Sequence, residues 1–120
     1  MSASRAFVLL ALAATAFAAP AQDYPKRPVR MVLTFGAPGG APDTIARTVG
    51  PELAKMWGYQ VVIDPRPGGG GMLATDIVSK ATPDGYTILL VSPSHVINPA
   101  LHSKMPFDPV KDFVGVTQVA

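Results

Sequence analysis

Apolar and polar residues alternate along the chain in blocks that predict strands followed by helices. The stretch from Val29 to Phe35 is almost continuously apolar, which is typical of a strand buried on both faces of a parallel sheet. Residues 60–63 and 86–91 repeat this pattern, and residues 86–91 form the clearest buried strand. Residues 114–120 have the composition of a fourth strand, at which the sequence ends.

Helical patterns lie between these strands. Apolar residues recur at every fourth position over residues 45–57, which places them on one face of a helix that Gly58 should end. Pro51 lacks a backbone N–H and clashes with the carbonyl four residues earlier. We therefore expect a kink or a split, with Pro51 opening a second short helix. Residues 72–81 predict another helix.

Two shorter segments complete the pattern near the C-terminal end. A short helical piece follows the third strand and should be interrupted at Pro99. Asp108 followed by Pro109 is typical of a helical turn, with Asp108 as the N-cap and the proline in the first helical position.

Three loops rich in glycine, proline and serine connect strands to helices, at residues 36–42, 64–71 and 92–95. Strands that alternate with helices predict βαβ units and a parallel sheet, so the expected fold class is α/β. Right-handed crossovers would place all three loops at one edge of that sheet. Ligands of open α/β sheets bind at this edge, beyond the carboxyl ends of the strands.

The first 21 residues predict a secretory signal peptide. Arg5 is the only charged residue before an apolar run over residues 6–19, which is shorter than the roughly 20 residues that span a bilayer. Small residues at cleavage-site spacing follow this run, so we expect cleavage after Ala21, with Ala18 as the alternative. The exported chain would then comprise residues 22–120, with no stable insertion into the membrane.

Composition excludes several classes of protein. A hydrophobic content of 48% argues against a disordered tail, and a net charge of +2 gives no basic surface for nucleic acid. The absence of cysteine excludes disulfide scaffolds, thiolate zinc sites and cysteine nucleophiles. An exported chain without cysteine is compatible with the bacterial periplasm, where disulfides are permitted but not required.

The glycine-rich loops offer the main candidate chemistry. The loop at 36–40 leads into a helix whose first N–H groups lack partners, and such a terminus attracts carboxylate or phosphate. In the alternative interpretation the glycines simply form a turn and Asp43 is an ordinary N-cap. Neither a G-x-G-x-x-G nor a P-loop motif is present. Arg66 could pair with a ligand carboxylate or could be a solvated loop residue.

Catalytic constellations are weak. Ser92, Ser94 and His95 share one loop, but the G-x-S-x-G motif is absent. His95 and His102 are seven residues apart and lack a third metal ligand. We therefore expect no catalytic residues, no metal and no cofactor, with His95 as a loop histidine that donates a hydrogen bond.

Several motifs, in order along residues 22–120, resemble the Bug-type receptors of tripartite tricarboxylate transporters. They are Tyr24-Pro25-Lys26-Arg27-Pro28-Val29-Arg30, Pro38-Gly39-Gly40 with Asp43 and Ala46-Arg47, Val61-Val62-Ile63-Asp64-Pro65-Arg66-Pro67-Gly68, Asp84-Gly85-Tyr86-Thr87, Asn98-Pro99, and Pro106-Phe107-Asp108-Pro109-Val110-Lys111-Asp112-Phe113. The resemblance implies a periplasmic solute-binding protein of the type II fold, with two lobes that close on a small organic acid. It also implies delivery of that acid to membrane transporter subunits or to a sensor ectodomain.

The resemblance further implies which residues of the first lobe face the ligand, with one carboxylate held by backbone amides and ordered waters. They are Phe35, Gly39, Gly40, Ala41, Gly70, Gly71, Ser92, Ser94 and His95. Two departures from the family pattern affect this set. Gly36-Ala37 lengthens the spacing after Phe35, and Ala41-Pro42 stands where a hydroxyl residue is frequent.

Members of this family are several-fold longer than 120 residues. We therefore expect the chain to be a fragment that holds the N-terminal portion of the first lobe, without the second lobe. An alternative is a secreted α/β enzyme whose catalytic residues lie in the missing part. A third interpretation is an exported structural or interaction module.

Overall fold

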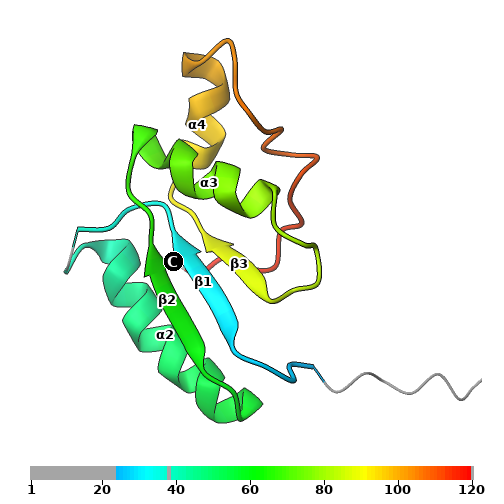
Figure 1. Cartoon of the computed structure of the whole chain (residues 1–120). Helices are drawn as coiled ribbons and strands as arrows, with labels where there is room; N and C mark the ends of the chain where they lie inside the picture. The colour runs from blue at the N-terminus through cyan, green and yellow to red at the C-terminus, as the bar shows by residue number, and fades with distance from the viewer. Residues whose placement is uncertain (1–23, 38, 120) are drawn as a thin grey trace, which may run out of the picture.

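The computed structural model describes residues 24–37 and 39–119, so the predicted signal peptide lies outside the described residues. Strands and helices alternate in the described chain, which confirms the expected α/β class (Figure 1). The elements are β1 (Val29–Leu33), α2 (Ala41–Trp57), β2 (Val61–Pro65), the 3₁₀ turn η2 (Gly69–Gly71), α3 (Met72–Ser79), β3 (Thr87–Leu90) and α4 (Ser94–Leu101).

The three strands form one parallel sheet in the order β2-β1-β3. Val29 lies opposite Val61 on one side of β1, and Arg30 lies opposite Thr87 on the other. The crossover through α2 leads to one side of β1 and the crossover through α3 leads to the other. Because both crossovers are expected to be right-handed, α2 and α3 cover opposite faces of the sheet (Figure 1).

The core is centred on β1, as its apolar sequence predicts. Val29, Val32 and Leu33 have no exposed surface, and Met31 is 5% exposed. Met31 and Leu33 pack with Ala46 of α2, inside a ring of partly buried residues: Leu53, Val61, Ile63, Ile88 and Leu90. The expectation that residues 86–91 form the most buried strand is wrong. All four residues of β3 are only half-buried because β3 lies at the edge of the described sheet.

The predicted split of the first helix at Pro51 is also wrong, since α2 is continuous through it. Gly50 precedes Pro51 and has no Cβ, which relieves the clash that disfavours helical geometry before a proline. Gly50 is also buried against β2. Gly58 ends the helix with a φ of 71°, as predicted, but the N-cap is Gly40 rather than Asp43, which lies in the first turn.

The C-terminal part differs from the sequence predictions in two places. Pro99 does not interrupt α4, because it removes one hydrogen bond and the amide of His102 resumes the ladder by donating to the Asn98 carbonyl at 2.9 Å. Residues 114–119 form no strand within the described chain, and Val114 there is 90% exposed. The predicted turn capped by Asp108 is confirmed, since its Oδ1 accepts hydrogen bonds from the amides of Val110 and Lys111 in a turn over residues 109–111.

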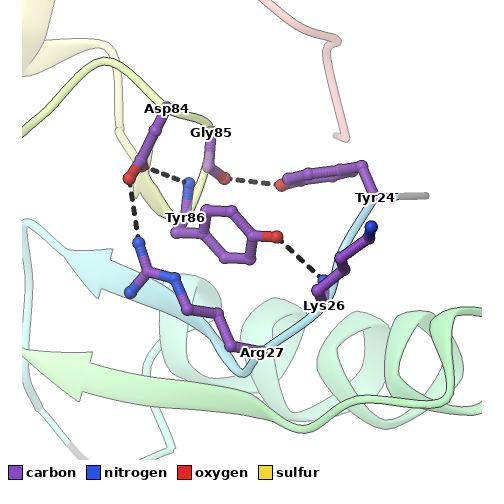
Figure 2. A network of polar contacts seen from close by, with 6 residues as sticks. All are labelled: Tyr24, Lys26, Arg27, Asp84, Gly85 and Tyr86. Carbon is purple, nitrogen blue, oxygen red and sulfur yellow. Dashed lines mark hydrogen bonds and ion pairs between the residues drawn. The ribbon is translucent and has the colours of Figure 1, made fainter. Parts of the chain in front are cut away.

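A polar network ties the start of the described chain to the turn before β3 (Figure 2). The Tyr24 hydroxyl donates to the Gly85 carbonyl at 2.6 Å. Arg27 pairs with Asp84 at 2.9 Å and lies 4.1 Å from the centre of the Tyr86 ring. This network lies at the amino ends of β1 and β3, opposite the edge where the strands end, so it anchors the N-terminal segment away from the loops.

Candidate functional site

Three loops meet at the edge of the sheet where β1, β2 and β3 end (Figure 1). The amide of Arg66, which follows β2, donates to the Leu33 carbonyl at 3.0 Å. The amide of Thr34, which follows β1, donates to the Leu90 carbonyl at 3.3 Å. These bonds hold the three loops side by side, as the parallel arrangement of the strands predicts.

Each of these loops leads into the N-terminus of a helix. The N-caps are Gly40 for α2, Gly71 for α3 and Pro93 for α4, and none of these three residues forms a capping hydrogen bond with its own side chain. The N-terminal end of a helix carries partial positive charge and attracts anions. The edge is therefore electrostatically suited to a carboxylate.

Gly71 is the point where the three loops come into contact. A Cβ placed at Gly71 would lie 3.0 Å from Cβ of Thr34 and 3.6 Å from Oγ of Ser94. Thr34 is 2% exposed and belongs to the first loop, while Ser94 begins α4. The φ of Gly71 is 92°, a value that favours glycine. Only glycine satisfies both the backbone conformation and the close approach.

Ser92 and Ser94 face each other at this contact. Their Oγ atoms are 2.9 Å apart, and the amide of Ser94 donates to Oγ of Ser92 at 3.3 Å. Both residues are half-buried, so their hydroxyl groups are fixed close to Gly71 while part of their surface remains accessible. This geometry suits hydroxyl donors to a bound oxygen.

His95 is not brought together with the two serines. Its Nε2 donates to the Pro109 carbonyl at 3.1 Å, because a carbonyl can only accept. Its ring stacks on Phe107 at a centroid distance of 6.5 Å and meets Phe113 edge-on at 5.3 Å. The hydrogen bond expected for His95 is present, but it holds residues 107–113 against α4.

The first loop contains the other predicted ligand residues. Phe35 is 36% exposed, Gly40 caps α2, and Ala41 is the first helical residue. Gly39 has a φ of 80°, and no atom lies within 4 Å of the position of a Cβ, so its surface is open. Gly36 packs on Pro67 of the second loop, because a Cβ at Gly36 would lie 3.0 Å from the proline ring.

Asp43 fixes the conformation of this first loop. Its carboxylate accepts a hydrogen bond from the Gly39 amide at 3.1 Å and from Nε of Arg47 at 2.9 Å. The Asp43 side chain is 7% exposed. The hydrogen bond from Arg47 and then that from Gly39 hold the pKa of Asp43 below its usual value, while burial opposes them.

We expect acid to loosen the Gly39 turn. Because the pKa of Asp43 is lower in the folded state than in the unfolded state, its stabilisation is complete above the unfolded pKa of about 3.9 and disappears as pH falls through the folded pKa. NMR titration of the Gly39 amide should show a transition below pH ~3.9. The Asp43→Asn variant, which carries no titrating group there, should lack that transition. A titration unchanged in this variant would contradict the assignment.

Arg66 is paired with a carboxylate of its own chain. Its Nε donates to Oδ1 of Asp64 at 2.9 Å, and Nε of Arg30 donates to Oδ2 of the same carboxylate at 2.7 Å. Burial raises the pKa of Asp64, but the hydrogen bonds from the two arginines outweigh it and lower the pKa overall. The geometry favours the interpretation of Arg66 as a loop residue paired within the chain.

Metal chemistry has no support in the described ranges, 24–37 and 39–119, where no group of three or more His, Cys, Asp or Glu residues is arranged to hold an ion. An open depression of about 550 Å³ lies beside the end of α4. Its lining comes from Pro99 and from residues 102–112, and includes none of the three loops.

No helix among these described residues is long and apolar enough to span a bilayer.

Two residues of this edge were missed by the sequence analysis as site residues. Thr34 ends an apolar run and was read as part of a strand, although its hydroxyl and amide both donate to the Leu90 carbonyl at 3.3 Å. Asn98 was noted only as part of a motif. Its side chain is 7% exposed, and a buried amide needs a hydrogen-bond partner. The sequence offers one signal for it, namely that Asn98 is the single asparagine of the chain.

Comparisons with known proteins agree on one group. A family model described as "Tripartite tricarboxylate transporter family receptor" matches residues 45–120. A UPF0065 protein from Bordetella bronchiseptica is 44% identical over 113 residues, which cover 93% of this chain and 33% of that protein. The chain therefore spans about a third of the length of this curated relative.

Solved structures that are similar to this chain include a periplasmic binding protein and two proteins with bound carboxylates. The periplasmic binding protein BugD matches with a TM-score of 0.70 and 38% identity, over 75% of this chain and 30% of that one. MatC from Rhodopseudomonas palustris, solved with bound malate, matches with a TM-score of 0.69 and 38% identity, over 75% and 31%. A further R. palustris protein, solved with adipate, gives 0.68 and 36%, over 72% and 29%.

Proposed function

Because this chain belongs to the receptor family of tripartite tricarboxylate transporters, we propose that it supplies one wall of a periplasmic site for a small carboxylate. The observation that carries this proposal is the meeting of Thr34, Gly71 and Ser94 at an edge where the N-termini of three helices lie. The family is one of solute receptors rather than enzymes, which fits the expected lack of catalysis.

The edge favours an anion with two or more acceptor oxygens. The positive N-terminal ends of α3 and α4 lie at this edge, although the first amides of both helices bond within the chain. The hydroxyls of Ser92 and Ser94 bond to each other, which leaves one of their two protons to donate to a ligand. Two related structures were solved with malate and with adipate, and both of these ligands are dicarboxylates. We propose a small di- or tricarboxylate as the ligand, with Phe35, Gly39, Gly40 and Ala41 on the first-loop side.

Transport follows from the family rather than from the geometry. We propose that the receptor resides in the periplasm and passes its ligand to membrane transporter subunits, or alternatively to a sensor ectodomain. The second wall of the site would come from outside the matched third, since the related proteins are about three times longer.

The proposal is tested by ligand-induced thermal shift on protein purified from the periplasmic fraction of its host. Malate and adipate should raise the melting temperature, because a ligand at 100 times its Kd stabilises the folded state by about 2.7 kcal/mol. The Ser94→Ala variant should weaken binding roughly 5- to 10-fold, the equivalent of one hydrogen bond. Ser79→Ala, at the far end of α3, is the matched control and should bind like the wild type.

Two results would count against this function. One is an equal thermal shift with the uncharged dimethyl esters of the same acids, since it would remove the role of the carboxylate. The other is the absence of any shift with di- and tricarboxylates at millimolar concentration.

A further inference from the structure

Asn98 makes a long-range contact that the proposed ligand contacts do not include. It lies on α4 and is 7% exposed, and its Nδ2 donates to the Gly70 carbonyl at 3.1 Å. The orientation of its amide follows from chemistry, because a carbonyl accepts and only the nitrogen side can donate. This bond joins two segments that are 28 residues apart in the chain.

The segment that Asn98 holds is conformationally demanding. Gly68, Gly69, Gly70 and Gly71 have φ values of 145°, 55°, 64° and 92°, all positive. Glycine loses more conformational freedom on folding than any other residue. None of these residues has a side chain with which to hold itself in place. Within the run, the Gly71 amide donates to the Gly68 carbonyl at 3.0 Å, and every further constraint must come from neighbouring residues.

Two side chains bond to carbonyls of this run, and they differ in what they constrain. Oγ1 of Thr75 donates to the Gly71 carbonyl at 2.9 Å, but Thr75 belongs to α3, the helix that the run itself begins. Asn98 comes from α4, on the far side of β3 in the sequence, so it ties the run to an independent element.

We propose that Asn98 is a positioning residue, which clamps the glycine run to α4 so that the start of α3 and the hydroxyl of Ser94 keep a fixed spacing. The consequence for affinity rests on the proposed function, whereas the effect on the order of the loop does not. Without the clamp, the run has more conformations available, and a ligand must order it on binding. Affinity therefore falls even where the fold survives.

The experiment compares three variants of the full chain by amide hydrogen exchange. Asn98→Ala removes the donor, and Asn98→Asp keeps the shape but has no N–H. Ala100→Gly is the matched control, since it weakens α4 at an exposed position without touching the run. Protection factors of the Gly69–Leu73 amides should fall about tenfold in the two Asn98 variants, in line with one lost bond. They should fall clearly less in Ala100→Gly.

A pH profile distinguishes positioning from a general packing role. In Asn98→Asp, the introduced carboxyl regains an O–H donor when it is protonated, so protection of the run should recover as pH falls through its titration. Asn98→Ala should show no such recovery. Equal protection of the run in Asn98→Ala and Ala100→Gly, or no recovery in Asn98→Asp, would overturn the proposal.

Malate titration of the same variants supplies the second readout. The Asn98 variants should bind about 3- to 10-fold more weakly than Ala100→Gly, because each must order the run on binding. Failure of the wild-type protein from the host periplasm to bind any di- or tricarboxylate would defeat the proposed function, and the exchange results would then decide on the clamp by themselves.

Discussion

Replacing Gly71 by alanine is expected to lower the free energy of unfolding by about 2–5 kcal/mol, from two costs that act together. An L-residue at a φ of 92° costs about 1–2 kcal/mol. The added Cβ would also lie 3.0 Å from Cβ of Thr34, and overpacking of this kind costs about 1–3 kcal/mol. Thr34 cannot withdraw easily, because it directly follows the central strand and is 2% exposed.

Urea denaturation of the wild type and of Gly71→Ala measures this effect directly. Gly39→Ala is the matched control, since Gly39 has a φ of 80° but no atom lies within 4 Å of the Cβ position. Its loss should be limited to the conformational cost of about 1–2 kcal/mol. Equal losses in the two variants would show that the contact between Gly71 and Thr34 is not tight.

Leu33→Ala is expected to destabilise the protein by about 2–5 kcal/mol, the range for a large-to-small change in a packed core. Leu33 has no exposed surface and ends the central strand, which pairs with both β2 and β3. It packs with Met31 and Ala46, so the cavity opens between the sheet and α2. Collapse of that cavity is limited because hydrogen bonds hold β1 on both sides.

The control for this change is Leu73→Ala on α3, where the side chain is 49% exposed. Half of its surface already contacts water, so its loss should be about 1 kcal/mol or less. Chemical denaturation of both variants gives the comparison. A loss for Leu33→Ala no larger than that for Leu73→Ala would place the core elsewhere than around β1.

The order of strands, loops and helices was predictable because it depends on short-range patterns. The apolar run at 29–35 predicted a strand buried on both faces, and β1 is that strand. The three loops were placed at one edge because strands joined by crossover helices run parallel, so that their carboxyl ends lie on the same side of the sheet. Local rules failed at Pro51, where the preceding glycine relieves the clash and packing against β2 holds the helix together.

The exposed segment at 114–119 shows the limit of composition. Its valines have high β-propensity, and the sequence therefore predicted a strand. A strand also needs a neighbouring strand that offers its hydrogen-bonding groups, and the described sheet consists of β2, β1 and β3, without residues 114–119. The β-propensity of single residues therefore does not predict a strand unless a second segment lies where it can pair with them.

By itself, the sequence determined the α/β class, the loop edge and the resemblance to carboxylate receptors, because periodicity, turn residues and ordered motifs are local properties. Only the tertiary structure decided which side chains meet at that edge. His95 donates a hydrogen bond to the Pro109 carbonyl, Arg66 donates to the Asp64 carboxylate, and Asn98 donates to the Gly70 carbonyl. The contacts of His95 and Asn98 depend on how α4 packs against segments distant in the chain. That of Arg66 depends on the path of its loop. The spacing of residues within one segment encodes neither the packing of α4 nor the path of that loop.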